Sequence, residues 1–143
     1  MTPDKENIII TVANKNDVNE IFSIEKECLN LWKKEYFINE FENDFSIVLK
    51  VEHNLNLTGF AVIWILSEEI QVQNISIKKN YQNQGIGSFL FNYIIQKYAQ
   101  KNKKDLILEV NSNNKHAIDF YKKCGFSCAS TTQSMWIYDG DDH

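Results

Sequence analysis

The sequence predicts an α/β protein with a mixed, mostly antiparallel sheet of about seven strands, flanked by about four helices. Three observations lead to this fold class. Short β-branched or alternating apolar segments are interspersed with segments of helical period, hairpin patterns occupy the middle and the end of the chain, and one buried-type strand stands between two helices. The length of 143 residues and the lack of any linker or repeat predict a single domain over residues 1–143.

The first third of the chain predicts a strand and two helices. "NIIITV" (7–12) is β-branched and predicts the strand. Residues 14–32 follow with an expected N-cap at Asp17, and "KEYFINEFEND" (34–44) predicts a second, short helix. The first helix carries an apolar stripe of helical spacing, which consists of Val18, Ile21, Phe22, Ile24 and Cys28.

Three strands are predicted next. "FSIVLKVEH" (45–53) and "LTGFAVIWIL" (57–66) alternate on either side of a short turn and predict a hairpin, in which Gly59 indicates a bulge or a close backbone approach. "EEIQVQNISI" (68–77) predicts a third strand. Its alternation slips once near Gln73 and Asn74, and such a slip is typical of a β-bulge.

The last third predicts two helices separated by a strand. Residues 86–98 carry an apolar helical face, "DLILEV" (105–110) predicts a buried strand, and residues 111–124 predict a helix that ends with Gly125 at C′. "SCASTTQSMWIYD" (127–139) predicts a closing hairpin. The expected order is therefore β-α-α-β-β-β-α-β-α-β-β.

Composition narrows the class of function. The formal charge is −4 and all fifteen basic residues are lysine, which disfavours a nucleic-acid binder and leaves no arginine fork for an anion. Cys28, Cys124 and Cys128 lack metal-ligand spacing, so we expect no metal and reduced thiols in a cytoplasmic protein. No signal peptide and no apolar run long enough to span a membrane is visible, and we expect no membrane partner.

The turn "YQNQGIGS" (81–88) holds two of the five glycines and opens a helix. The first N–H groups of a helix have no internal acceptor and carry a partial positive charge, so glycine there lets an anion approach the backbone. This turn predicts a phosphate or pyrophosphate site; the alternative is a plain helix-entry turn. It lacks the third glycine of a dinucleotide fingerprint and the Gly-Lys-Ser/Thr of a P-loop.

Two further residues stand out by type and place. Glu109 lies in an otherwise apolar strand, where a carboxylate is costly unless it is paired; the alternative is a solvent-facing strand end. Tyr121 follows Phe120 on the last helix, where a tyrosine commonly packs in the core. From the residues alone both alternatives stay open.

Taken together, "YQNQGIGSFLF" and "LEVNSNNKHAIDFYKKCGF" resemble the acyl-CoA-binding motif and the downstream block of the GNAT superfamily of N-acetyltransferases, and among these the bacterial ribosomal-protein alanine N-acetyltransferases. The resemblance covers roughly residues 8 to 138. It implies a single acyl-CoA N-acyltransferase domain over 1–143, a splayed central strand, acetyl-CoA as cosubstrate, Tyr121 as general acid and Glu109 as general base. The implied cofactor-binding residues are Ile75, Ser76, Ile77, Gln82, Asn83, Gln84, Gly85, Ile86, Gly87, Ser88 and Asn114.

The resemblance also implies an acceptor, a primary amine and foremost a protein N-terminal α-amine. A small amine such as a polyamine, amino acid or antibiotic is the alternative, as is a non-catalytic CoA-binding module, and the oligomeric state (monomer or homodimer) stays open. Glu68 and Glu69 are alternative bases. The ribosomal-protein enzymes follow Gly-Phe with an arginine, a Tyr-Tyr pair and a longer loop, whereas this chain has only "SCASTTQSMW" there, so its acceptor side differs.

Overall fold

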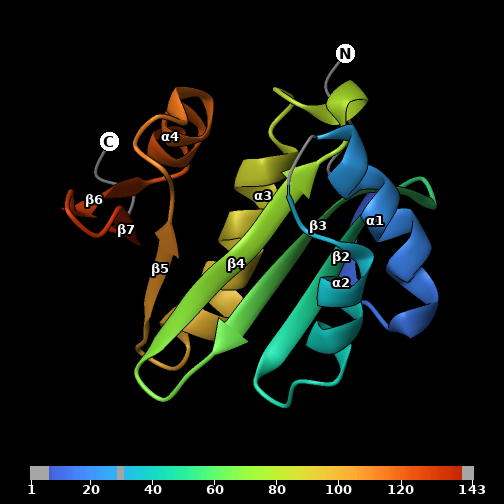
Figure 1. Cartoon of the computed structure of the whole chain (residues 1–143), viewed down its shortest axis with the longest axis horizontal. Helices are drawn as coiled ribbons and strands as arrows, with labels where there is room; N and C mark the ends of the chain where they lie inside the picture. Colours follow the sequence, from blue (N-terminus) through green and yellow to red (C-terminus); the bar gives the residue numbers. More distant parts are fainter. Residues whose placement is uncertain (1–6, 29–30, 140–143) are drawn as a thin grey trace.

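The computed structural model describes residues 7–28 and 31–139, which fold around one seven-stranded sheet with helices on both faces (Figure 1). The strand order across the sheet is β1-β2-β3-β4-β5-β7-β6. All neighbouring pairs are antiparallel except β4 with β5, which is parallel. The strands are β1 (Ile8–Val12), β2 (Ser46–His53), β3 (Asn56–Ile65), β4 (Glu69–Ile77), β5 (Asp105–Glu109), β6 (Phe126–Ser130) and β7 (Met135–Tyr138).

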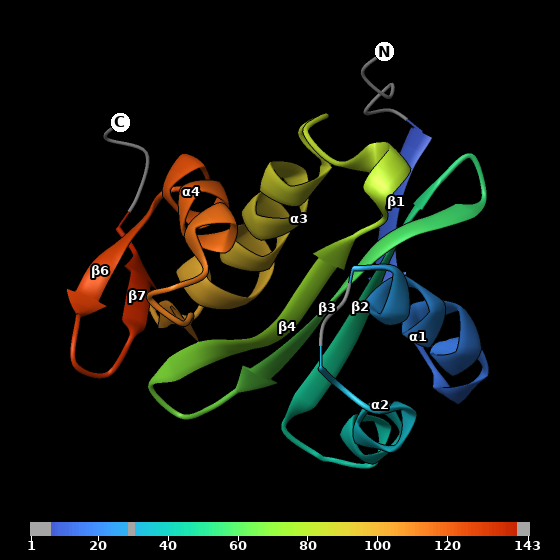
Figure 2. The ribbon, with the colours of Figure 1, turned by 45° about the horizontal axis from the view of Figure 1, so that its top comes forward.

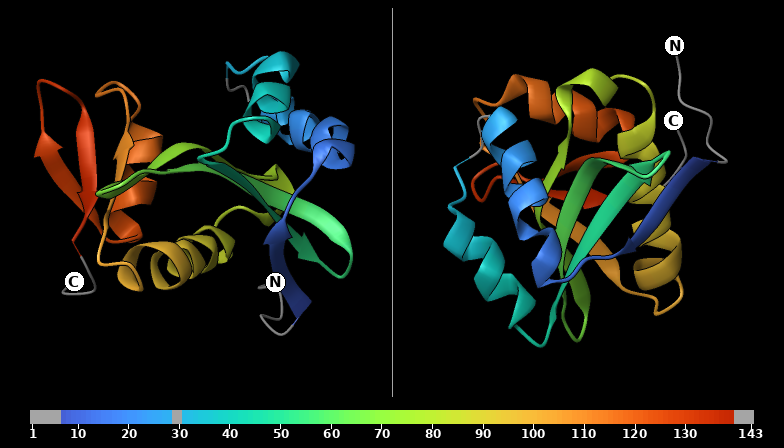
Figure 3. Two further views of the ribbon diagram at one scale, coloured as in Figure 1. Left: turned by 90° about the horizontal axis from the view of Figure 1, so that it is seen from below. Right: turned by 90° about the vertical axis from the view of Figure 1, so that its right-hand side faces the viewer.

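The helices divide between the two faces of the sheet (Figure 3). α1 (Val18–Glu27) and α2 (Lys34–Phe41) cover one face, on which Phe37 packs against Phe60 with ring centroids 5.4 Å apart. α3 (Ile86–Ile94), its π-helical continuation η4 (Ile95–Gln100) and α4 (Lys115–Lys123) cover the other face (Figure 2). The 3₁₀ turns η2 (Lys15–Asp17) and η3 (Lys79–Tyr81) precede α1 and α3.

Alternation along β2 and β3 builds both cores from the same strands. Val48, Phe60 and Val62 face α1 and α2, whereas Leu49, Ala61 and Ile63 belong to the cluster under α3. A central strand with helices on both faces buries every side chain, which explains the continuous apolar run from Phe60 to Ile63.

The bulge predicted in β4 is confirmed. Val62 pairs with Asn74 and the next residue of β3, Ile63, pairs with Val72, so Gln73 is the extra residue. A second bulge precedes Gly59 in β3, because Val51 pairs with Gly59 while Glu52 pairs with Leu57. The close approach expected at Gly59 is also present, since a Cβ there would lie 2.8 Å from the Ser76 carbonyl oxygen.

The order of elements predicted from the sequence is confirmed, including Gly125 after α4 with a φ of +103°. Asp17 differs in detail: it stands at the N-cap of α1, but its side chain accepts from the backbone N–H of Asn14 and binds Lys50 at 3.1 Å. None of the helices within the described ranges is both long and apolar enough to cross a membrane.

Candidate functional site

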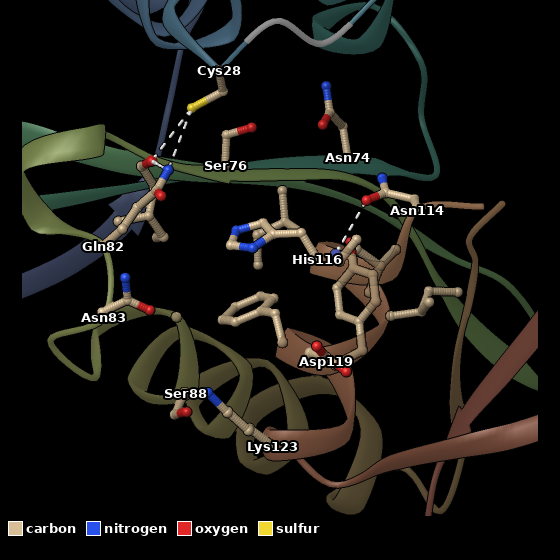
Figure 4. Close-up of a pocket in the computed structure, with 18 of the residues that line it drawn as sticks. Cys28, Asn74, Ser76, Gln82, Asn83, Ser88, Asn114, His116, Asp119 and Lys123 are labelled. Carbon is tan, nitrogen blue, oxygen red and sulfur yellow. Dashed lines mark hydrogen bonds between the residues drawn. The ribbon is translucent and has the colours of Figure 1, made fainter. Parts of the chain in front are cut away.

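The parallel strands β4 and β5 separate partway along their length. They pair from Glu69 with Asp105 to Val72 with Leu108, and beyond this point β4 continues to Ile77 without β5 beside it. The split opens a cleft of about 700 Å³ that is lined by the end of β4, the end of β5, the turn into α3 and one side of α4 (Figure 4). The splayed central strand implied by the sequence resemblance is therefore present.

The turn into α3 presents its backbone amides at one end of this cleft. Asn83 and Gly85 both have left-handed backbones, with φ of +61° and +86°. The first intrahelical bond runs from Phe89 N to Gly85 O at 3.0 Å, so the N–H groups of residues 86–88 have no acceptor among the described residues. Amides that converge in this way, at the positive end of a helix, make an anion-binding concavity.

The two glycines of the turn serve different purposes. Gly85 has open space where a side chain would stand but needs its positive φ. Gly87 is helical and buried, and a Cβ there would lie 2.5 Å from Cε1 of Phe120 on α4. The first glycine thus shapes the turn, and the second lets α4 pack closely against α3.

The other predicted residues of the turn use their side chains to support its backbone. The Gln82 amide donates to the Ile77 carbonyl at 2.9 Å, and the Gln84 amide donates to the Asn80 carbonyl at 2.9 Å. Ile86 is buried in the core. These three side chains hold the turn in place. Gln82, Asn83, Gly85, Gly87 and Ser88 line the cleft, whereas Gln84 and Ile86 do not.

The predicted β4 residues Ile75, Ser76 and Ile77 line the cleft along the part of the strand that has no β5 beside it. Asn114 lines it from the start of α4, where its Oδ1 accepts from the Ala117 N–H at 3.1 Å and caps the helix. The amide nitrogen of Asn114 thereby remains as a donor on the cleft side.

Tyr121 reaches the cleft from an aromatic cluster. Its ring packs edge-on against Phe91 and Phe126, with both centroid distances 6.0 Å. Burial, with a smaller contribution from Cys124, raises the pKa of Tyr121 to about 12. The phenol is therefore a proton donor, not a phenolate, throughout the neutral pH range.

Glu109 is the last residue of β5 and is exposed to solvent within the cleft lining. The alternative of a solvent-facing strand end is therefore confirmed, and this strand end forms part of the wall of the cleft. Glu68 and Glu69 lie at the opposite end of β4, where Glu69 pairs with Asp105, and neither lines the cleft. Among these three carboxylates, only Glu109 is placed to act in the cleft.

Several cleft residues were not predicted. Lys123 lines the cleft beside Ser88 (Figure 4). It also lines a smaller pocket of about 340 Å³ next to the cleft. His116 and Asp119 line the cleft from α4. The available signal was their spacing, because residues 116, 119, 120 and 123 share one helix face.

Cys28 also lines the cleft, from the end of α1. Its Sγ donates to the Ile77 carbonyl at 3.4 Å, and burial is the largest cause that raises the pKa of its thiol. The three cysteines are unpaired. Within residues 7–28 and 31–139, no group of three or more His, Cys, Asp and Glu side chains is placed to bind a metal.

Comparison with known proteins gives concordant matches. The model of the acetyltransferase (GNAT) family matches residues 16–126. A Bacillus subtilis protein provisionally named a ribosomal protein bS18-alanine N-acetyltransferase is 30% identical over 128 residues, which are 88% of this chain and 85% of that protein. The Escherichia coli ribosomal protein bS18-alanine N-acetyltransferase is 25% identical over 105 residues, 73% of this chain and 70% of the relative.

Solved structures share the fold. The crystal structure of the Escherichia coli ribosomal-protein-S18-alanine N-acetyltransferase superposes with a TM-score of 0.78 at 21% identity, covering 95% of this chain and 98% of that one. The PaiA N-acetyltransferase of Thermoplasma acidophilum, solved in complex with coenzyme A, gives a TM-score of 0.75 at 20% identity, covering 91% and 96%.

Proposed function

Because this chain belongs to the GNAT family of acetyltransferases, we propose that it acetylates the α-amino group at the N-terminus of a basic polypeptide. As a family member it is an N-acetyltransferase that takes the acetyl group from acetyl-CoA and transfers it to an amine. One observation carries the proposal: the split between β4 and β5 joins an anion-binding helix N-terminus to Glu109 and Tyr121 within one cleft.

The cosubstrate fits this cleft by charge and shape. The amides of residues 83–88 would bind the diphosphate, and the left-handed φ values of Asn83 and Gly85 support this role. Backbone groups of β4 near Ile75, on the side of the strand that β5 does not cover, and the amide nitrogen of Asn114 would bind the pantetheine amides. Lys123, next to Ser88, would add a cation beside the phosphates.

The chemistry is a direct transfer. The amine nitrogen attacks the thioester carbonyl carbon, the C–N bond forms, and the C–S bond breaks with its electron pair left on sulfur. Glu109 takes the proton from the amine through water, and Tyr121 supplies a proton to the departing thiolate. A backbone N–H near Ile75, freed by the adjacent bulge, would bind the carbonyl oxygen as it gains charge.

An α-amine suits a base that is exposed to water. Its pKa of 7.7–8.0 means that neutralising it at pH 7 costs about 1–1.4 kcal/mol, whereas a lysine side chain with a pKa near 10.4 costs about 4.6 kcal/mol. Glu109 is exposed and acts through water, so it meets the smaller demand.

The distribution of charge supports a basic acceptor. Residues 1–70 hold 13 of the 19 acidic residues and 6 of the 15 basic ones, so this half has a net charge of −7 while residues 71–143 have +3. The basic half supplies the helix N-terminus and Lys123 for an anionic cosubstrate, and the acidic half supplies α1 and α2 on the other face. Complementary charge of this kind favours a cationic partner. The relatives named as ribosomal-protein alanine acetyltransferases agree with such a partner.

Free CoA thiol released from acetyl-CoA measures the reaction. We expect the fastest release with peptides that have a free N-terminal alanine and downstream basic residues, and at least tenfold slower release when the same peptides are blocked at the N-terminus. A faster release with spermidine than with the peptides would mean that the acceptor is a polyamine. The acidic face formed by α1 and α2 would attract a polyamine as well. If no amine led to the release of CoA thiol, the remaining explanation would be a module that binds CoA without catalysis. Three unpaired cysteines and the use of acetyl-CoA support a cytoplasmic place of action.

A further inference from the structure

The carboxylate of Glu25 is fully buried on α1, with 0% of the residue exposed. A buried carboxylate is costly unless hydrogen bonds satisfy it. Oε1 of Glu25 accepts from Nδ2 of Asn74 at 2.9 Å, and Oε2 accepts from the backbone N–H of Trp32 at 2.9 Å. One side chain thus joins α1, the segment that enters α2 and the splayed strand β4.

Glu25 determines which way the Asn74 amide points. Because Oε1 of Glu25 accepts from Nδ2 of Asn74, the NH₂ group of Asn74 faces Glu25 and its carbonyl oxygen faces away. No donor among the described residues binds that oxygen, and no buried oxygen in this part of the chain lacks a partner, so Oδ1 of Asn74 is open to the cleft that the residue lines.

Asn74 lies where an incoming amine would arrive. It directly follows the bulge residue Gln73, just beyond the last pair of β4 with β5. Its side chain points to the same side of β4 as Ser76 and toward the end of α1 that carries Cys28, opposite the turn into α3 (Figure 4). A cosubstrate held by its phosphates at α3 therefore leaves the Asn74 side of the cleft to the acceptor.

Building on the proposed function, we propose that Oδ1 of Asn74 accepts a hydrogen bond from the acceptor amine and that Glu25 is the positioning residue that turns Oδ1 toward it. With one N–H directed to Asn74, rotation of the amine is restricted and its lone pair can face the thioester carbonyl. A primary amine of any class supplies this N–H. Glu25 and Asn74 therefore recognise the reacting nitrogen, while the acidic surface of α1 and α2 selects the molecule that carries this nitrogen.

Exchanging the two side-chain types tests the proposal. In Glu25→Gln the amide oxygen keeps the Trp32 bond and the new NH₂ faces Asn74, so Asn74 must turn its oxygen inward and present NH₂ to the cleft. We expect KM for the acceptor to rise at least tenfold, while KM for acetyl-CoA stays within about twofold. Adding Asn74→Asp provides one carboxylate oxygen that accepts from the new amide at position 25 and a second oxygen that faces the cleft. The KM of the double variant for the acceptor should therefore return to within about threefold of that of the unmodified chain.

The kinetics are measured with the amine that the unmodified chain acetylates fastest, so that a different acceptor class would overturn the proposed function but leave this comparison intact. Ser23→Ala, an exposed change on the same helix that leaves its charge unaltered, is the matched control and should change neither KM. Melting temperatures of all variants are recorded alongside. An acceptor KM that stays unchanged in folded Glu25→Gln, or one that the second substitution does not restore, would overturn the proposal.

Discussion

The ring of Phe120 on α4 lies against the backbone of Gly87 on α3, so close that a methyl group on Gly87 would stand 2.5 Å from Cε1 of Phe120. Phe120 also packs against Phe91, with ring centroids 5.9 Å apart. This contact fixes the distance between α3, which presents the backbone amides, and α4, which carries Tyr121. One aromatic ring therefore sets the distance between the proposed phosphate site and the proposed proton donor.

Gly87→Ala should destabilise the chain and weaken acetyl-CoA binding together. Overpacking at such a site costs about 1–3 kcal/mol, and relief requires Phe120 to move into the cleft. Thermal unfolding with and without acetyl-CoA measures both effects. Gly85→Asn is the matched control for the melting temperature without acetyl-CoA, because asparagine tolerates the positive φ and nothing lies within 4 Å of the new Cβ. An unchanged melting temperature for Gly87→Ala would contradict the close packing.

Tyr121→Phe should lower turnover at least tenfold and leave acetyl-CoA binding nearly intact. The substitution removes the phenolic proton but keeps the ring that packs against Phe91 and Phe126. Steady-state rates at saturating acetyl-CoA and a melting shift with the cosubstrate separate the two effects. Equal turnover of variant and parent would exclude Tyr121 as the general acid.

The raised pKa of Tyr121 also predicts how stability changes in alkali. Between pH 10, where an unfolded tyrosine ionises, and about 12, where Tyr121 ionises in the fold, the folded state binds more protons, so its stability falls as pH rises. The loss from this group is about 2–3 kcal/mol over that window. Urea unfolding at pH 9 and pH 11.5 measures it, and Tyr121→Phe should show a correspondingly smaller drop. A drop of the same size in both would show that other groups cause it.

Glu109→Gln should change the pH dependence of the rate. If Glu109 accepts the proton from the amine, the variant should lose most of its activity below pH 8 and recover part of it at higher pH, where the acceptor amine is already neutral. The profile of kcat/KM from pH 6 to 9.5 records this change. If the variant and the parent had pH profiles of the same shape, water alone would accept the proton, since Glu68 and Glu69 do not line the cleft.

Lys123→Ala should raise KM for acetyl-CoA several-fold. The interaction that is lost joins the exposed lysine to the phosphates and is screened by salt, so the difference in KM between variant and parent should become smaller as the salt concentration rises. The adjacent Lys122 provides the control, since its amine lies 5.9 Å from the centre of the Trp136 ring and does not line the cleft. Lys122→Ala should therefore leave KM for acetyl-CoA unchanged. Equal effects of the two substitutions would exclude a specific role for Lys123.

Local patterns in the sequence were sufficient to predict the backbone conformation around the site. The slip in alternation at Gln73 located the bulge, and the glycines at 85 and 125 marked the turn into α3 and the end of α4. These features depend on neighbouring residues, because they reflect backbone conformation. The role of Glu109 in the cleft wall needed the additional knowledge that β4 and β5 separate beside it.

Contacts between distant segments could not be predicted in the same way. Glu25 lies on the apolar stripe of α1, which hinted at burial, but its partner Asn74 is 49 residues away. The ring of Phe120 meets Gly87 from 33 positions further along the chain. The position of Lys123 at the cleft could not be predicted, because it depends on how α4 packs against α3. Such pairings follow from tertiary packing, which no local period encodes.

From Gln73 to Ile77, β4 pairs with β3 but has no β5 on its other side, which leaves a strand edge inside the molecule rather than at its rim. Such an edge is a template for a foreign extended segment, including one from a misfolded neighbour. A bound pantetheine arm would occupy it and, by mass action, favour the native form. The supply of acetyl-CoA in the cell would then govern the lifetime of this protein as well as the rate at which it works.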